Sequence, residues 1–231
     1  MNIYITGDTH RDFDRIKDFC EKENTSNEDI IIILGDAGIN YYLFGRDNDL
    51  KAELNTLPVT LFCIHGNHEE RPYNIPSYEE QPWHGGTAYI EPAYPNLIFG
   101  KDGEIYDFNG RKYIVIGGAY SIDKSFRLQN GWNWFESEQP DDDTKAYTEQ
   151  QLDSVDWKIY GVLTHTMPKA YEPSWAFLSG IDPEKVDKST ELWLDKIEKR
   201  LTYEKWYAGH YHVDSQEGPI KVMFRSVERL G

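Results

Sequence analysis

Residues 30–38 read IIIILGDAG, an apolar run that ends in an aspartate between small residues, and this stretch decides the fold. A short, uninterrupted apolar run indicates a strand that is buried on both faces of its sheet. Similar runs occupy residues 2–6 and 59–64, and two segments with helical periodicity, 12–23 and 47–57, separate the three runs. Strands that alternate with helices predict a parallel sheet of βαβ units and hence an α/β fold.

The middle and the last part of the chain predict shorter elements. Five prolines between residues 72 and 95 predict a long looped region, and Asn109-Gly110 predicts a hairpin turn. The other expected elements are strands at 97–99, 104–108, 112–116, 159–163 and 206–207, helices near 148–152 and at 190–199, a solvated turn at 141–143 and a terminal hairpin from 213. We find no internal repeat and no clear linker, and therefore expect residues 1–231 to form a single domain.

The composition restricts the possible partners. The chain has 40 acidic and 24 basic residues and a formal net charge of −16, which argues against general binding to nucleic acid or to an anionic membrane. A phosphate-bearing substrate remains compatible with this charge, because divalent metal ions would dominate the local field of a site. The apolar runs are too short for a membrane span.

Two features predict a cytoplasmic protein. The sequence passes from Met1 directly into a strand-like segment, so we expect no secretory signal. The two cysteines, Cys20 and Cys63, have apolar neighbours and lack the spacing of a metal site. We expect them to be buried free thiols, as in a reducing compartment.

Potential metal ligands follow the apolar strands. In an open α/β sheet, the loops at the carboxyl ends of neighbouring strands meet, so side chains on these loops are expected to share one cleft. Mixed oxygen and nitrogen ligands suit manganese, iron or zinc better than calcium. The motifs concerned are Gly7-Asp8-Thr9-His10, Gly35-Asp36, Gly66-Asn67-His68, Thr164-His165 and Gly209-His210-Tyr211-His212.

The order of these motifs carries a family resemblance. Asp-x-His, Gly-Asp, Gly-Asn-His, His and Gly-His-x-His occur in this order from Asp8 to His212, and the arrangement resembles the calcineurin-like metallophosphoesterase superfamily. The resemblance implies a metallophosphatase-type two-sheet β sandwich with helices on its outer faces. It also implies hydrolysis of phosphate mono- or diesters, in which two metal ions bind the phosphoryl oxygens and activate a bridging hydroxide for in-line attack.

The resemblance also implies a role for each motif residue. Asp36 would bridge the two metals, and His68 would be the general acid or an electrostatic partner of the phosphate. The metal ligands would form two sets, with Asp8, His10 and His212 on one ion and Asn67, His165 and His210 on the other. Manganese is the expected metal, and iron, zinc, nickel and magnesium are alternatives.

One position departs from the family pattern. Protein phosphatases of this superfamily carry an Asp-Arg pair three and four residues after the bridging aspartate, where this chain has Ile39 and Asn40. We therefore favour a small molecule or a nucleotide as substrate. The alternatives are a phosphoprotein phosphatase, which the Gly-Asn-His-Glu sequence at residues 66–69 supports, and a weakly catalytic binding scaffold.

Several residues are candidates for the phosphate-binding role of the missing pair. A guanidinium group can hold a phosphate through two hydrogen bonds. We select Arg11 and Arg127, because both follow expected strand ends, and add Asn40 for its position in the pattern. Arg46, Arg71 and Asp123 are further candidates, and for each arginine an ordinary surface charge is the alternative.

Overall fold

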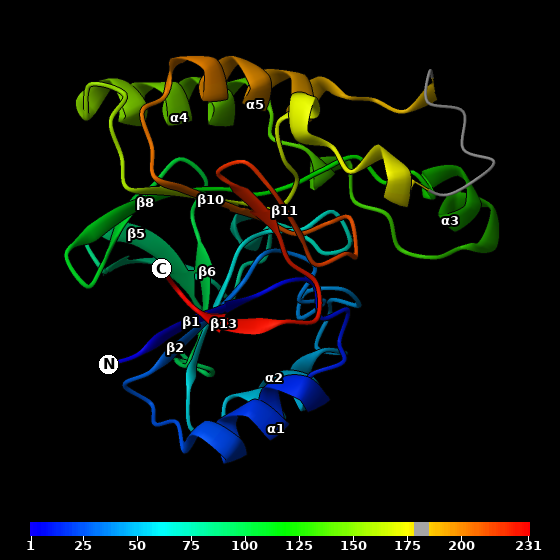
Figure 1. Ribbon diagram of the computed structural model, residues 1–231. Coiled ribbons are helices and arrows are strands. Elements are labelled where there is room, and N and C mark those ends of the chain that lie inside the picture. Colours follow the sequence, from blue (N-terminus) through cyan, green and yellow to red (C-terminus); the bar gives the residue numbers. More distant parts are fainter. Residues whose placement is uncertain (178–184) are drawn as a thin grey trace.

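Two β-sheets pack face to face in the computed structural model, which describes residues 1–177 and 185–231 (Figure 1). The first sheet has the strand order β13-β1-β2-β3-β6-β5-β4. Its strands are β1 (Ile3–Thr6), β2 (Ile30–Ile33), β3 (Thr60–Cys63), β4 (Glu79–Trp83), β5 (Gly86–Ile90), β6 (Leu97–Gly100) and β13 (Val227–Arg229). Strands β1, β2 and β3 are parallel, as the βαβ pattern predicts, and β6 is parallel to β3.

The second sheet has the order β11-β12-β10-β9-β8-β7. Its strands are β7 (Ile105–Phe108), β8 (Arg111–Ile116), β9 (Gly161–Thr164), β10 (Lys205–Ala208), β11 (Ser215–Glu217) and β12 (Ile220–Val222). Strands β8, β9, β10 and β12 are parallel. The expected hairpin at Asn109-Gly110 is confirmed, since both residues have positive φ angles and join β7 to β8.

Helices cover the outer faces of both sheets, which confirms the expected architecture. Helices α1 (Asp14–Glu23) and α2 (Asn48–Leu54) lie against the first sheet, and α4 (Asp142–Ser154) and α5 (Ser189–Arg200) lie against the second (Figure 1). A further short helix, α3 (Lys124–Asn130), projects at one side of the molecule. Among the described residues, no helix combines the length and the apolarity that a membrane crossing requires.

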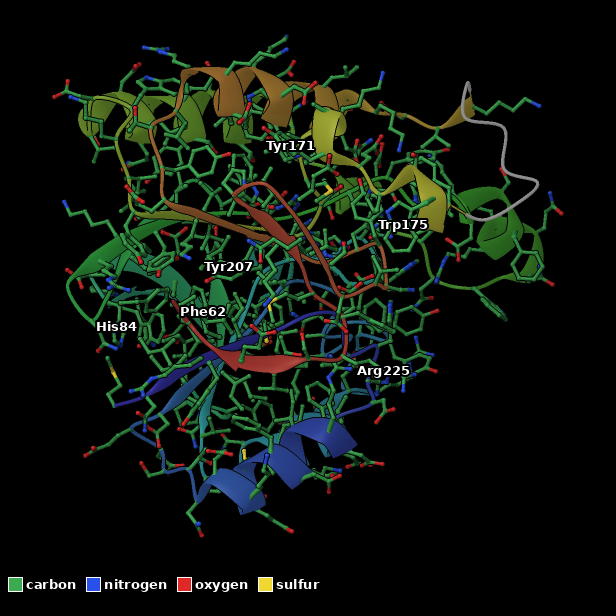
Figure 2. The ribbon with its side chains drawn as sticks, viewed as in Figure 1. Phe62, His84, Tyr171, Trp175, Tyr207 and Arg225 are labelled. Atoms are coloured by element: carbon green, nitrogen blue, oxygen red, sulfur yellow. The ribbon has the colours of Figure 1, made fainter. Side chains whose placement is uncertain are left out.

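The four isoleucines of β2 explain the layering. Ile30 and Ile32 belong to the apolar core between the sheets, which also contains Phe62 and Tyr207 (Figure 2). Ile31 and Ile33 belong to the core between the first sheet and its helices. Each side chain is at most 3% exposed, and full burial of an isoleucine contributes about 1.5–3 kcal/mol. Both cysteines are free and buried, as expected.

The structure corrects the expected loop at residues 72–95. Strands β4 and β5 form an antiparallel hairpin there, with its turn at His84 and Gly85. Pro82 is tolerated because β4 is the edge strand of its sheet. No strand lies on the open side of an edge strand, so a missing N–H on that side breaks no hydrogen bond. Residues 141–143 are exposed, as expected, but they do not form a turn, since α4 begins at Asp142 and Asp141 caps it by accepting a hydrogen bond from the Thr144 amide.

Candidate metal centre

The loops at the carboxyl ends of the parallel strands meet where the two sheets face each other. Asp8 follows β1 in the first sheet, and His210 follows β10 in the second. The His210 amide donates a hydrogen bond of 2.9 Å to Asp8 Oδ1, although 202 residues separate the two. All seven side chains that the sequence singles out as metal ligands are brought together in this region.

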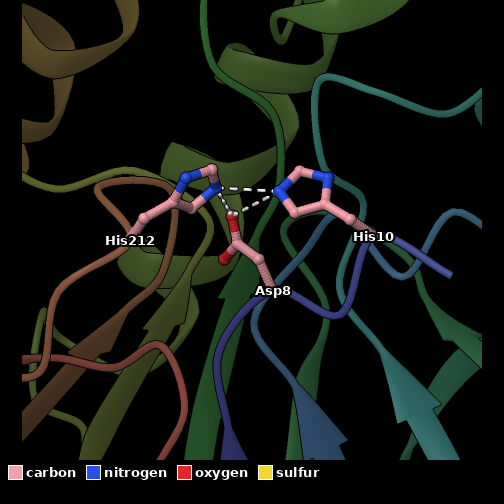
Figure 3. Close-up of side chains that lie close together, drawn as sticks. All are labelled: Asp8, His10 and His212. Carbon is pink, nitrogen blue, oxygen red and sulfur yellow. Dashed lines mark hydrogen bonds and ion pairs between the residues drawn. The ribbon is translucent and has the colours of Figure 1, made fainter. Parts of the chain in front are cut away.

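Asp8, His10 and His212 form one group of candidate ligands (Figure 3). The Nε2 atoms of the two histidines lie 2.8 Å apart, and His212 Nε2 lies 3.2 Å from Asp8 Oδ2. Asp8 is 1% exposed, and the His212 ring at 3.2 Å is the nearest possible donor to its Oδ2 among the described residues. A buried carboxylate oxygen with no backbone or amide donor is costly unless His212 is protonated or a cation lies between the two groups.

Asp36 connects this group to a second one. Its Oδ2 lies 3.8 Å from His10 Nε2, and its Oδ1 lies 3.7 Å from His165 Nε2. Asn67 Oδ1 lies 2.8 Å from His165 Nε2 and 3.1 Å from His210 Nδ1. Asp36 is therefore the carboxylate that lies between the two ligand groups.

The hydrogen bonds around His165 are suited to a cation. His165 Nδ1 lies 2.8 Å from the Leu34 carbonyl, which can only accept, so this nitrogen carries the proton and Nε2 of the neutral ring has a lone pair. Asn67 Nδ2 donates to Ser121 Oγ, which directs Oδ1 toward the same Nε2. Two acceptors that face each other at 2.8 Å are repulsive unless a proton or a metal ion lies between them.

The backbone is strained at the candidate ligands. His10, Asp36, His210 and His212 all have φ between 45° and 67°, a region that residues other than glycine rarely adopt. Such outliers concentrate at functional sites, where the surrounding structure enforces them. Close packing adds to this constraint, because a Cβ atom on Gly66 would lie 2.0 Å from Asp36 Oδ1.

The electrostatics of Asp36 and His210 favour the protonation states that bind metal, whereas the hydrogen bond to Asp8 raises the pKa of His212. Burial acts to raise the pKa of Asp36, but His68, His165 and His10 outweigh it, so the pKa lies below its ordinary value. Burial, assisted by His165, lowers the pKa of His210 to about 3. At neutral pH Asp36 is therefore ionised and His210 is neutral, as metal coordination requires.

His68 lies beside the cluster, and Arg127 lies beside His68. His68 Nε2 is 3.8 Å from Asp36 Oδ2, and the His68 amide donates to Asp36 Oδ1. Arg127 Nη2 is 3.5 Å from His68 Nε2. Burial, with a contribution from Arg127, lowers the pKa of His68.

The other candidate phosphate-binding residues make different contacts. Arg11 Nη1 donates to the Gly38 carbonyl and to Asp47 Oδ1, both at 2.6 Å. Asn40 is fully buried, and its Oδ1 accepts a hydrogen bond from the Tyr78 hydroxyl. Arg71 is buried in an ion pair with Asp102. These contacts fasten loops to the body of the fold, whereas Arg127 contacts the motif residue His68.

Sequence reasoning missed two residues that support the centre. Glu69 is fully buried, and its carboxylate accepts hydrogen bonds from the Ala37 and Gly38 amides, directly after Asp36. Burial, followed by the influence of Asp36, raises the pKa of Glu69 to about 8. The only sequence signal was its place after Asn67-His68.

The second missed residue is Tyr211, which lies between His210 and His212 in the sequence. Its hydroxyl lies 3.0 Å from Thr166 Oγ1 and donates to Glu172 Oε1 at 3.0 Å. Thr166 directly follows His165, so the tyrosine joins two ligand-bearing loops. The available signal was its place between the two histidines of the Gly-His-x-His motif, although the segment is not extended, since His210 and His212 have positive φ angles.

Comparison with known proteins assigns the chain to one family. A family model described as calcineurin-like phosphoesterase matches residues 1–214. No curated protein matches the chain at a significant level. Among solved structures, phosphopantetheinyl hydrolase (PptH) from Mycobacterium tuberculosis aligns with a TM-score of 0.52 and 12% identity over 96% of this chain and 88% of that chain. TT1561 of Thermus thermophilus aligns with a TM-score of 0.49 and 13% identity over 98% and 96%. At these identities, the structural likeness concerns the fold alone.

Proposed function

The chain belongs to the calcineurin-like phosphoesterase family, and from this premise we propose that it hydrolyses phosphate mono- or diesters of small molecules or nucleotides at a centre of two divalent metal ions. One observation carries the proposal: Asp36 lies between two groups of candidate ligands and is within 3.8 Å of His10 and His165. A carboxylate in this position is suited to bridge two ions.

The candidate ligands divide into two sets, and Asp36 is shared by both. Asp8 Oδ2, which faces the rings of His212 and His10, supports the first set, and the facing atoms of Asn67 and His165 support the second. Manganese fits the mixed oxygen and nitrogen donors. The bound ions would supply Lewis acidity and lower the pKa of a water molecule. We assign Asp8, His10 and His212 to one ion and Asn67, His165 and His210 to the other.

We assign the proton transfer to His68, which is 18% exposed and so reaches the surface of the cluster. As the new P–O bond to water forms and the ester P–O bond breaks, His68 gives the proton on Nε2 to the leaving oxygen. The proton of the attacking water passes to solvent. The products are an alcohol and either inorganic phosphate or a phosphomonoester.

The substrate preference rests on Ile39 and Asn40. Both side chains are fully buried, so this segment presents no charged group to a phosphopeptide in the way that an Asp-Arg pair would. We therefore favour small esters over phosphoproteins. The free, buried thiols of Cys20 and Cys63 support our further proposal of a reducing, cytoplasmic compartment.

The test is metal-dependent hydrolysis by chelator-treated protein. Added Mn²⁺ should restore hydrolysis of chromogenic phosphate mono- and diesters, at higher rates than on phosphopeptides. His68→Ala should lower kcat by about 10²–10⁴-fold, as expected for loss of a general acid. His84→Ala, in the β4–β5 turn (Figure 2), is the matched control and should leave kcat unchanged. Absence of hydrolysis with every divalent metal would refute the proposal.

A further inference from the structure

An Asp-Arg pair lies beside the centre, but a different segment supplies it. Asp123 immediately precedes α3, and Arg127 lies one turn later, so the two side chains occupy neighbouring positions. Arg127 Nε donates to Asp123 Oδ2 at 2.8 Å. The side chain of Arg127 is 12% exposed, so the charge is held close to the protein rather than extended into solvent.

The orientation of the Arg127 guanidinium is fixed on several sides. Its Nη1 donates to the Tyr41 hydroxyl at 3.4 Å and to the Asn133 carbonyl at 3.3 Å. The Asn133 side chain in turn donates to the Tyr41 carbonyl at 2.6 Å, which fastens the segment after α3 to the loop after β2. These contacts preorganise the guanidinium, so little rotamer freedom remains to be lost on binding.

The remaining edge of the guanidinium faces the centre. Nη2 carries two N–H groups and lies 3.5 Å from His68 Nε2, the nitrogen whose proton goes to the leaving oxygen. These N–H groups are available to a phosphoryl oxygen bound next to His68. Arg11 and Arg71 lack this geometry: their guanidinium groups bind Asp47 and Asp102, and no contact of either with His68 occurs among the described residues.

We propose that Arg127 is the phosphate-binding residue of this centre and that Asp123 is the positioning residue that holds it. The inference rests on the proposed function and deepens it. Arg127 binds a phosphoryl oxygen and at the same time limits the movement of His68. The pair thus supplies from α3 the charges that Ile39 and Asn40 do not carry.

The experiment uses full-length, Mn²⁺-loaded protein and the variants Arg127→Ala, Arg127→Lys and Asp123→Asn. Arg200→Ala is the matched control, because Arg200 at the end of α5 forms an exposed ion pair with Asp153 of α4. For each protein, kcat and KM for a chromogenic monoester and the inhibition constant of inorganic phosphate are measured. Thermal unfolding of each variant verifies that it is folded.

Arg127→Ala should weaken inhibition by inorganic phosphate at least about tenfold and lower kcat/KM by about 10²-fold, as for loss of a charged donor at a transition state. Added guanidinium ion should partly restore Arg127→Ala and should not restore His68→Ala. Arg127→Lys should recover only part of the activity, since an ammonium group lacks the planar fork. Asp123→Asn should raise KM more than it lowers kcat.

Failure of this inference differs from failure of the proposed function. If the wild type hydrolyses esters with metal but Arg127→Ala and Arg127→Lys match Arg200→Ala in KM and in phosphate inhibition, the inference is wrong and the function stands. If the wild type shows no hydrolysis, calorimetric titration of the Mn²⁺-loaded protein with inorganic phosphate decides. Equal phosphate affinity of wild type and Arg127→Ala would overturn the inference.

Discussion

Replacing Glu69 with alanine should destabilise the turn that carries Asp36 and weaken metal binding. The Glu69 carboxylate accepts hydrogen bonds from the Ala37 and Gly38 amides at 3.2 and 3.1 Å, and the whole residue is buried. Alanine would leave both amides without a partner in a region that excludes water. Asp36 directly precedes them, so its carboxylate would lose its fixed position.

The size of the effect follows from the two lost hydrogen bonds. Each buried, unsatisfied amide costs about 1–3 kcal/mol, so Glu69→Ala should lower the free energy of unfolding by roughly 2–6 kcal/mol. Because burial raises the pKa of Glu69 to about 8, the carboxyl is largely protonated at pH 7. Removing a neutral carboxyl group relieves little of the cost of burying a charge. This relief therefore does not offset the free energy lost with the two hydrogen bonds.

Urea unfolding of chelator-treated protein at pH 7 measures the stability, and calorimetric titration with Mn²⁺ measures metal affinity. Glu69→Gln is the comparison variant, since its amide retains one acceptor oxygen and should show about half of the stability loss. Glu53→Ala, on the surface of α2, is the control and should change neither quantity. A Glu69→Ala variant with wild-type stability and Mn²⁺ affinity would refute this reasoning.

Three further predictions concern the same region. Tyr211→Phe should raise the dissociation constant of Mn²⁺ about tenfold in calorimetry, because the hydroxyl joins the loops of His165 and His210 and each lost hydrogen bond costs about 1 kcal/mol. An unchanged constant would contradict this prediction. Burial lowers the pKa of His65 well below 6.5, so the folded state binds fewer protons, and His65 alone should lower the unfolding free energy by about 1.6 kcal/mol from pH 6.5 to 5; His65→Gln should reduce the pH slope by this amount in urea titrations. Mn²⁺ at 100 times its dissociation constant should stabilise the chain by about 2.7 kcal/mol for each ion bound, visible as a higher melting temperature that a chelator reverses.

The sequence predicted the buried framework well because burial leaves a local pattern. The isoleucines of β2 indicate a strand covered on both sides, and they are covered on both sides. Helix α3 escaped prediction because none of its residues is buried, so no apolar periodicity marks it. The β4–β5 hairpin escaped because Pro82 suggests a loop unless the strand is known to lie at an edge.

The candidate ligands were identified by type and order, whereas the arginine next to His68 was not decided by the sequence. Arg11 and Arg127 both follow strand ends, and only the three-dimensional contacts separate them. Asp47, 36 residues after Arg11, holds the first, while α3 brings the second to His68. Pairings over such distances leave no local pattern in the chain.

The wide spacing of the ligands has a consequence for biosynthesis. Asp8 leaves the ribosome 202 residues ahead of His210, and His212 follows later still. Under the proposed assignment, a nascent chain that lacks the second sheet has Asp8, His10, Asp36 and Asn67 but not His165, His210 or His212, so both ligand sets are incomplete. Metallation would then have to wait until the second sheet has been synthesised.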